Sequence, residues 1–276
     1  MKAVVVSPHL DDAVLGCGVF LARAPGATVV TVCAGVPRPD SQLTEWDAAC
    51  GFGSAREAIE ARRDEDRQAL ATLGALPRCL DYLDDQYGQE DSEGSKDSED
   101  RQWISSVARD VRRVIREIDP DVVLCPLGLF HHDHDRVHAA ARLVLQQEQD
   151  RTWYAYEDAL YRRIPGLVQQ RLAELAANHV VATPADLAPG AFSRRGSEPT
   201  SRACRQTPPG PLSGPCPPSS SLTSFAAASR AKRRAILCYA SQLRGLGTPG
   251  RPGHRDALAP ESYWKLSPGD GKERAP

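Results

Sequence analysis

The sequence lacks any apolar run near the roughly 20 residues that a membrane-spanning helix needs, and its N-terminus lacks the basic and apolar regions of a secretion signal. It also lacks an excess of charge, because 34 basic residues nearly balance 36 acidic ones and the net charge is −2. We therefore expect a cytoplasmic protein without membrane insertion and without a broad cationic field for nucleic acid. A small-molecule partner is favoured, and nothing in the composition sets an oligomeric state.

Two common motifs are also missing. The eight cysteines are dispersed and form no CxxC pair, which favours buried free thiols over a disulfide framework or a thiolate zinc site. The turn after the first apolar run carries acids and no GxGxxG. That turn would repel a pyrophosphate, so a dinucleotide-binding oxidoreductase is disfavoured.

The pattern that is present alternates strands with helices. Hydrophobic residues make up 41% of the chain, enough for a substantial core. Strand-like runs such as VVLC are apolar throughout, as expected of a parallel strand buried on both faces. The sequence predicts an α/β, Rossmann-like fold with a mostly parallel sheet and helices on both faces. The expected strands are 2–7, 27–33, 78–83 and 121–126, and the expected helices are 12–23, 54–73, 102–118 and 134–149.

Beyond two further predicted strands, at 152–160 and 179–183, the composition changes. Residues 194–221 hold seven prolines and cannot form a helix or a central strand. We predict an irregular Pro/Ser-rich insertion that hangs free, covers the substrate mouth as a lid, or reflects an out-of-frame reading of the gene. Helical spacing returns at 223–246, which we interpret as a closing helix of a single domain spanning 1–276.

Chemistry-bearing residues gather after two of the predicted strands. SPHLDD (7–12) follows the first strand, and HHDHDRVH (131–138) follows the strand at 121–126. A parallel sheet can place both strand ends side by side, where ligands bind in such folds. His9 and Asp12 can face one centre, and imidazole plus carboxylate suits a divalent metal, zinc above all. The second cluster can supply the third ligand, whereas Asp12 alone could merely cap a helix.

These two segments resemble the signature motifs of the PIG-L/LmbE-like zinc-dependent N-acetylglucosamine deacetylases. Further blocks are similar to that family, namely RRDEDRQALATLGA (62–75), LDYLDD (80–85) and AKRRAILCYASQL (231–243). The resemblance covers most of the chain except 194–221. LDYLDDQYG and TEWDAACGF are similar to the glycopeptide-antibiotic, teicoplanin-type pseudoaglycone deacetylase subgroup.

The resemblance implies a role for each residue of the two motifs. Zinc would be held by His9, Asp12 and His134. Asp11 would be the general base, His131 would stabilise the oxyanion, and Asp133 would orient His131 and keep it protonated. The family commonly has glutamate where this chain has Ala13, which affects only a supporting or capping contact.

Other residues take less direct roles. The resemblance makes Arg62 a candidate for substrate binding; the alternative is a solvated helix arginine beside Glu65 and Asp66. Asp84 and Asp85 follow a predicted strand and are candidates for binding sugar hydroxyls, and we favour one of the two at the site. We interpret His132 as facing solvent or lining the mouth. His138 is interpreted as a buried helix residue or a support for the ligands, and direct metal ligation is disfavoured for both.

The function implied is zinc-dependent hydrolysis of the N-acetyl or N-acyl group of a glucosamine-containing small molecule, such as a glycopeptide antibiotic pseudoaglycone. One alternative is a deacetylase of a thiol-precursor glycoside, such as a mycothiol or bacillithiol intermediate. Another is a non-catalytic, metal-dependent sugar-binding protein, which would not need Asp11 or His131.

Overall fold

The computed structural model describes residues 1–88, 96–187, 224–251 and 253–269. Within them the chain forms one seven-stranded sheet in the order β3-β2-β1-β4-β5-β7-β6. The strands are β1 (Ala3–Ser7), β2 (Thr28–Thr31), β3 (Leu76–Cys79), β4 (Val122–Pro126), β5 (Thr152–Tyr156), β6 (Val180–Ala185) and β7 (Tyr263–Pro268). All pairings from β3 through β5 are parallel, whereas β7 is antiparallel to both of its neighbours.

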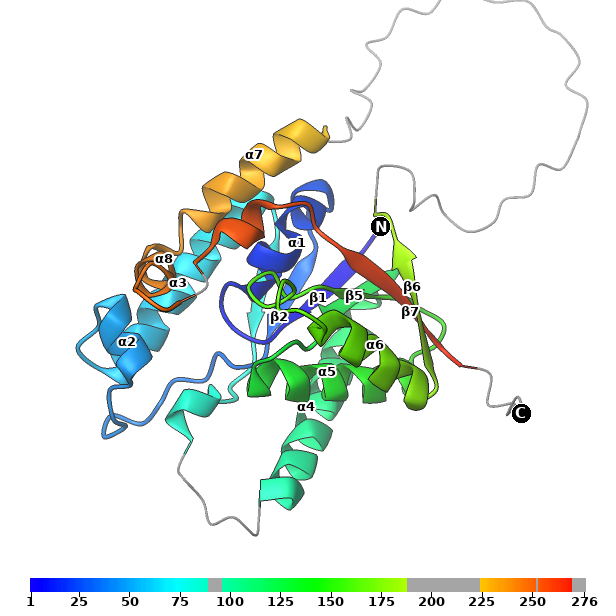
Figure 1. The fold of residues 1–276 in the computed structure, drawn as a ribbon, viewed down its shortest axis with the longest axis horizontal. Coiled ribbons are helices and arrows are strands. Elements are labelled where there is room, and N and C mark those ends of the chain that lie inside the picture. The colour runs from blue at the N-terminus through cyan, green and yellow to red at the C-terminus, as the bar shows by residue number, and fades with distance from the viewer. Residues whose placement is uncertain (89–95, 188–223, 252, 270–276) are drawn as a thin grey trace, which may run out of the picture.

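Helices cover both faces of this sheet (Figure 1). Side chains alternate between the two faces of the sheet along β1. Val5 packs in a core with the helices at 12–23, 55–73 and 225–236, whereas Val4 and Val6 pack in a core with the helices at 96–118, 132–147 and 167–177. The mostly parallel, Rossmann-like architecture is as predicted. The helices are α1 (Asp12–Arg23), α2 (Glu45–Cys50), α3 (Ala55–Leu73), α4 (Lys96–Ile118), α5 (His132–Gln147), α6 (Leu167–Ala177), α7 (Phe225–Ile236) and α8 (Ala240–Leu246), with short 3₁₀ turns at Asp85–Tyr87 and Arg255–Leu258.

The strand order reverses beside β1, which pairs with β2 on one side and β4 on the other. The carboxyl ends of β1 and β4 are therefore neighbours, and the loops that leave them carry the two polar motifs. In the loop after β4, Gly128 adopts a φ of +81°. A Cβ atom on Gly128 would lie 2.5 Å from Cβ of His138, so this loop can pass α5 only with glycine there.

The end of the chain differs from the prediction. The single helix expected at 223–246 is two helices, α7 and α8, separated at Leu237–Tyr239. The chain then returns to the sheet as β7, which inserts between β5 and β6 and was not predicted. A six-residue strand among turn-forming residues carries little periodic signal. The insertion predicted at 194–221 lies outside the described residues.

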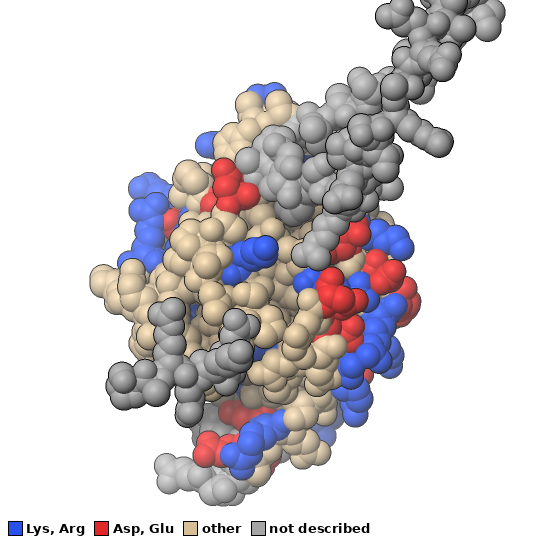
Figure 2. Space-filling model, turned by 90° about the vertical axis from the view of Figure 1, so that its right-hand side faces the viewer, with Lys and Arg blue, Asp and Glu red and all other residues tan. Residues whose placement is uncertain are grey.

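The described residues show the state of the cysteines, the apolarity of the helices and the distribution of surface charge. Six cysteines fall in them, all as free thiols. No helix in the described ranges combines the length and the apolarity needed to cross a membrane. On the face shown in Figure 2, acidic and basic side chains lie next to one another around uncharged surface.

Candidate metal centre and its cavity

The first motif occupies the tight turn between β1 and α1. The Ser7 hydroxyl donates to the carbonyl oxygen of His9 (2.8 Å) and accepts from the backbone N–H of Ala13 (3.0 Å), which fixes the turn. Asp11 is the N-cap residue of α1, yet its side chain makes no capping hydrogen bond. Its carboxylate lines the cavity together with His9 and Asp12.

The second motif starts α5. His131 is the N-cap residue, and its Nδ1 atom accepts the backbone N–H of Asp133 at 3.2 Å. His134 follows within the first turn of the helix and is buried. The imidazole rings of His9, His131 and His134 lie together, with centroids 5.0 to 5.4 Å apart.

The three predicted metal ligands are brought together. Oδ2 of Asp12 lies 3.2 Å from Nδ1 of His9 and 3.2 Å from Nε2 of His134. A ligand atom from each residue lies within 4.8 Å of the other two, close enough to share one ion. Two imidazole nitrogens and one carboxylate oxygen, all from buried residues, are a donor set typical of a zinc site with a position left for water or substrate. The residues therefore fit a divalent metal.

Asp133 is placed differently from the expectation. Its carboxylate makes no hydrogen bond to the ring of His131 among the described contacts; Oδ2 lies 3.0 Å from Nε2 of His9, and Oδ1 accepts from Arg136 at 2.5 Å. The only Asp133 atom bonded to His131 among the described contacts is its backbone N–H. Nδ1 of His131 is already occupied by the backbone N–H of Asp133, and the Asp133 carboxylate lies against His9 in the turn after β1. Asp133 thus orients His9, and the expected protonation of His131 by this carboxylate is not supported.

Burial and local charge set the protonation of the two candidate catalytic groups. Burial and the neighbouring Asp12 carboxylate raise the pKa of Asp11 to about 7, against the opposing effect of Arg62. Burial and the nearby His9 and His134 lower the pKa of His131 to about 4. His131 is therefore neutral near pH 7, and because Nδ1 accepts a hydrogen bond, its proton lies on Nε2.

The three candidate substrate-binding residues differ in their positions relative to the cavity. Arg62 of α3 is buried at the cavity, its Nη1 lies 3.7 Å from Oδ2 of Asp84, and its Nε has no hydrogen-bond partner among the described residues. Asp84 is buried and lines the cavity. Asp85 does not line the cavity; its partly exposed carboxylate lies 3.8 Å from Arg136, and its backbone N–H donates to Asp133 at 2.9 Å. Of the two acids, Asp84 is the one at the site.

The two remaining histidines lie outside the group of candidate metal ligands. His138 is buried in α5, and its Nδ1 lies 2.9 Å from the carbonyl oxygen of Pro126. It is not one of the described residues whose ligand atoms are close enough to share a metal ion. His132 is partly exposed and lies 3.5 Å from Asp100.

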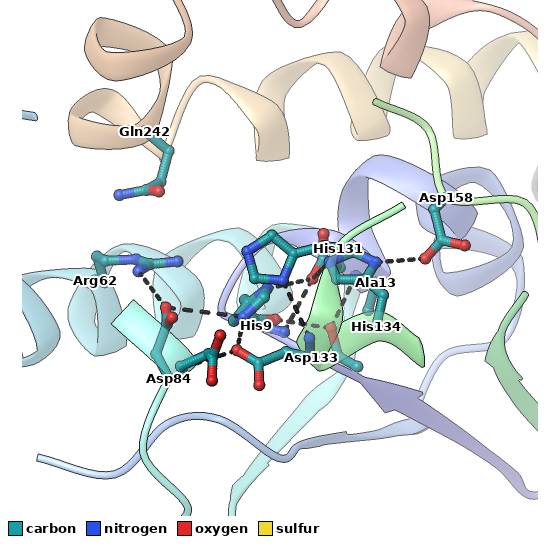
Figure 3. Close-up of polar contacts among 12 residues, drawn as sticks. His9, Ala13, Arg62, Asp84, His131, Asp133, His134, Asp158 and Gln242 are labelled. Atoms are coloured by element: carbon teal, nitrogen blue, oxygen red, sulfur yellow. Dashed lines mark hydrogen bonds and ion pairs between the residues drawn. The ribbon is translucent and has the colours of Figure 1, made fainter. Parts of the chain in front are cut away.

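The cavity, of about 620 Å³, has walls that the sequence did not indicate. In Figure 3, Gln242 of α8 lies beyond Arg62 on one side of the site, and Asp158 lies behind His134 on the other. Apolar and aromatic residues also line the cavity, namely Trp46, Phe130, Leu160, Tyr161, Ile164 and Leu246. Asp158 could have been found from its position just past a buried strand, but the strand was predicted to run on to residue 160. Gln242 carried no signal, because a lone amide on a helix has no characteristic spacing.

Comparison with known proteins gives a family and a fold. The family model described as PIG-L, GlcNAc-PI de-N-acetylase, matches residues 4–145, which is slightly more than half of the chain. Among curated proteins, no sequence matches this chain.

Several solved structures share the whole fold. The zinc-inhibited form of the teicoplanin deacetylase Orf2 is 21% identical, covering 99% of this chain and 100% of that one, with a TM-score of 0.68. A deacetylase–teicoplanin complex from teicoplanin biosynthesis is 22% identical, with the same coverage and a TM-score of 0.64. The A40926 pseudoaglycone deacetylase Dbv21 is 24% identical, covering 98% of each chain, with a TM-score of 0.63. At these identities the likeness establishes a common fold.

Proposed function

The chain belongs to the PIG-L family of de-N-acetylases, and on this premise we propose that it hydrolyses the N-acyl group of a glucosamine-containing small molecule with the help of a bound zinc ion. The observation that carries the proposal is the convergence of His9, Asp12 and His134 on one centre, inside a cavity that also holds Asp11 and His131.

A divalent ion would be held by His9, Asp12 and His134. The chemistry that zinc supplies at such a position is Lewis acidity, which makes water more acidic and polarises an amide carbonyl. Asp11 makes no hydrogen bond that would occupy it as a helix cap, so it is available to accept the proton of the attacking water. Once it holds that proton, the same carboxyl lines the cavity and can return the proton to the departing amine.

His131 supplies a hydrogen-bond donor. Its Nδ1 is occupied by the backbone N–H of Asp133, so the Nε2–H of the neutral ring is left to face the cavity. A neutral N–H donor stabilises negative charge that develops on the carbonyl oxygen as water adds. The C–N bond then breaks, and the products are a carboxylic acid and the free amino sugar.

The residues that line the cavity are suited to a substrate in which a sugar is joined to an apolar group. Arg62, Asp84 and Gln242 line the cavity with polar side chains suited to hydroxyl groups. Its apolar and aromatic lining residues are suited to a hydrophobic aglycone, and one of them, Phe130, is 70% exposed. We propose a glycopeptide-type pseudoaglycone as the conjugate, in line with the activities of the solved proteins that share the fold.

The test is mass spectrometry of the zinc-loaded protein incubated with N-acetylglucosaminyl pseudoaglycone, with a thiol-precursor glycoside, and with free N-acetylglucosamine. We expect loss of one acetyl group from the pseudoaglycone and slower reaction of the other two. Binding of all three compounds without a change in their mass would refute the proposed hydrolysis and would favour a non-catalytic sugar-binding protein. Preferred reaction of the thiol-precursor glycoside would refute the proposed substrate class.

A further inference from the structure

Asp158 makes contacts that the catalytic proposal leaves unused. It lies two residues beyond the end of β5 and is buried. Oδ1 lies 2.6 Å from Nδ1 of His134, while Oδ2 accepts the backbone N–H groups of Gly128 (2.9 Å) and Leu129 (3.0 Å). Both backbone partners are donors, so an acceptor-only carboxylate matches them.

The contact with His134 determines which ring nitrogen is free. Nδ1 faces Asp158, whereas Nε2 faces Asp12 and the candidate metal centre. A carboxylate at Nδ1 holds a proton on that atom and leaves the lone pair of Nε2 for a metal. The same hydrogen bond fixes the orientation of the ring.

The contact with the backbone positions a second part of the site. Gly128 and Leu129 lie in the loop between β4 and α5, which continues directly into Phe130 and His131. On the other side, the carbonyl oxygen of Asp158 accepts the N–H of Tyr161 at 3.0 Å. Tyr161 stacks on Phe130 at 5.2 Å between ring centroids and meets His134 edge-on at 5.4 Å. One residue therefore ties a metal ligand to the cavity wall.

We propose that Asp158 is a positioning residue that sets the tautomer and orientation of His134 for metal binding while anchoring the loop that carries His131. This rests on the proposed function, since it takes His134 as a metal ligand. A purely structural anchor would hold the loop without affecting the affinity for metal.

The variant that separates these two roles is Asp158→Asn, which keeps the size of the side chain. If the amide oxygen accepts from the backbone, its NH₂ group faces Nδ1 of His134, which must then accept and carry its proton on Nε2. We expect zinc affinity, measured by competition with a chromophoric chelator, to fall about 10–100-fold. Asp256→Asn is the matched control, because Asp256 is also mostly buried and pairs with two arginines instead of a histidine; its zinc affinity should be unchanged.

A second measurement does not depend on the variant folding. In ¹⁵N NMR of the zinc-loaded wild type, Nδ1 of His134 should carry a proton; an unprotonated Nδ1 overturns the proposal. Wild-type zinc affinity retained in Asp158→Asn overturns it as well and leaves the proposed hydrolase intact. A wild type that binds no zinc overturns both, so the two failures are distinguishable.

Discussion

Nε2 of His9 lies 3.0 Å from Oδ2 of Asp133, on the opposite side of the ring from Nδ1, which faces Asp12. His134 is held in the same way, with one nitrogen toward Asp12 and the other on a buried carboxylate. Neither ring can rotate without breaking a hydrogen bond in a buried setting. The ligand atoms are therefore preorganised, which favours metal binding without rearrangement.

Metal removal should abolish activity. We expect metal analysis to find about one zinc ion per chain, chelation to remove both zinc and deacetylation, and added zinc to restore them. His134→Ala should lose the metal, because two of the three ligands then remain. His179→Asn, at an exposed histidine remote in sequence from both motifs, is the control and should keep it. Full activity of a verified metal-free protein would contradict this prediction.

Asp11 should be needed for turnover and not for metal binding. Asp11→Asn keeps the shape of the side chain but cannot accept the proton of water, so kcat should fall about 10²–10⁴-fold. Zinc content, measured on the same preparation, should match the wild type. A variant that retains both zinc and near-normal kcat would remove the general-base role.

The sequence indicated the candidate site through two short motifs, each placed directly after a predicted strand. His9, Asp12 and His134 follow strand ends, and the parallel-sheet rule brings those ends together. The partner of Asp133 could not be predicted in this way, because it depends on how α5 is rotated against β1. Asp158 and Gln242 reach the site from β5 and α8, over separations along the chain that no local pattern encodes.

The fold, too, was predicted where a local pattern encodes it and missed where contacts between distant segments determine it. Apolar parallel strands such as β1 and β4 were evident, since burial on both faces leaves no polar side to the strand. β7 was missed because it is short, mixed in composition and antiparallel, and its place between β5 and β6 is set by contacts with those strands. The break between α7 and α8 was missed because the apolar spacing continues across it.

The pair Asp84 and Asp85 offers a comparison of two adjacent acids. Asp84→Asn should lower kcat/KM about tenfold or more, because a buried carboxylate beside Arg62 would lose its charge at the cavity. Asp85→Asn should have a smaller effect, since it keeps the backbone N–H that donates to Asp133, and its partly exposed carboxylate meets only Arg136, at 3.8 Å. The measurement is steady-state kinetics of both variants on one substrate. Equal losses in the two variants would count against placing Asp84 alone at the substrate.

Phe130 should contribute to affinity for substrates with a large apolar group. Phe130→Ala removes an exposed aromatic surface at the mouth, and KM for a pseudoaglycone conjugate should rise about tenfold, the equivalent of roughly 1.4 kcal/mol of apolar contact. KM for free N-acetylglucosamine should change little. Phe225→Ala is the control, because Phe225 is similarly exposed but lines a different cavity. A parallel rise in both KM values would show that Phe130 acts on the site in general.

Asp66 should make stability depend on pH. This buried carboxyl lies on α3, one turn after Arg62, and accepts the Tyr239 hydroxyl at 2.7 Å through Oδ1, while Oδ2 has no partner among the described residues. Burial raises its pKa from the ordinary 3.8 to about 6, against the opposing effects of Tyr239 and Arg62. The folded chain therefore binds this proton more tightly than the unfolded chain, so protonation favours folding.

The contribution of Asp66 to the free energy of unfolding is most favourable below its unfolded pKa and is lost as pH rises through about 6. Asp66→Asn cannot ionise, so the comparison isolates this carboxyl from all others. Between pH 7 and pH 5, the free energy of unfolding of the wild type should increase relative to the variant by about 1 kcal/mol. Urea unfolding of both proteins at the two pH values measures this change, and Asp64→Asn, on the exposed face of the same helix, is the control. A difference that stays constant, or that moves toward the variant at pH 5, would mean that Asp66 remains ionised in the folded protein and that the Tyr239 and Arg62 contacts outweigh its burial.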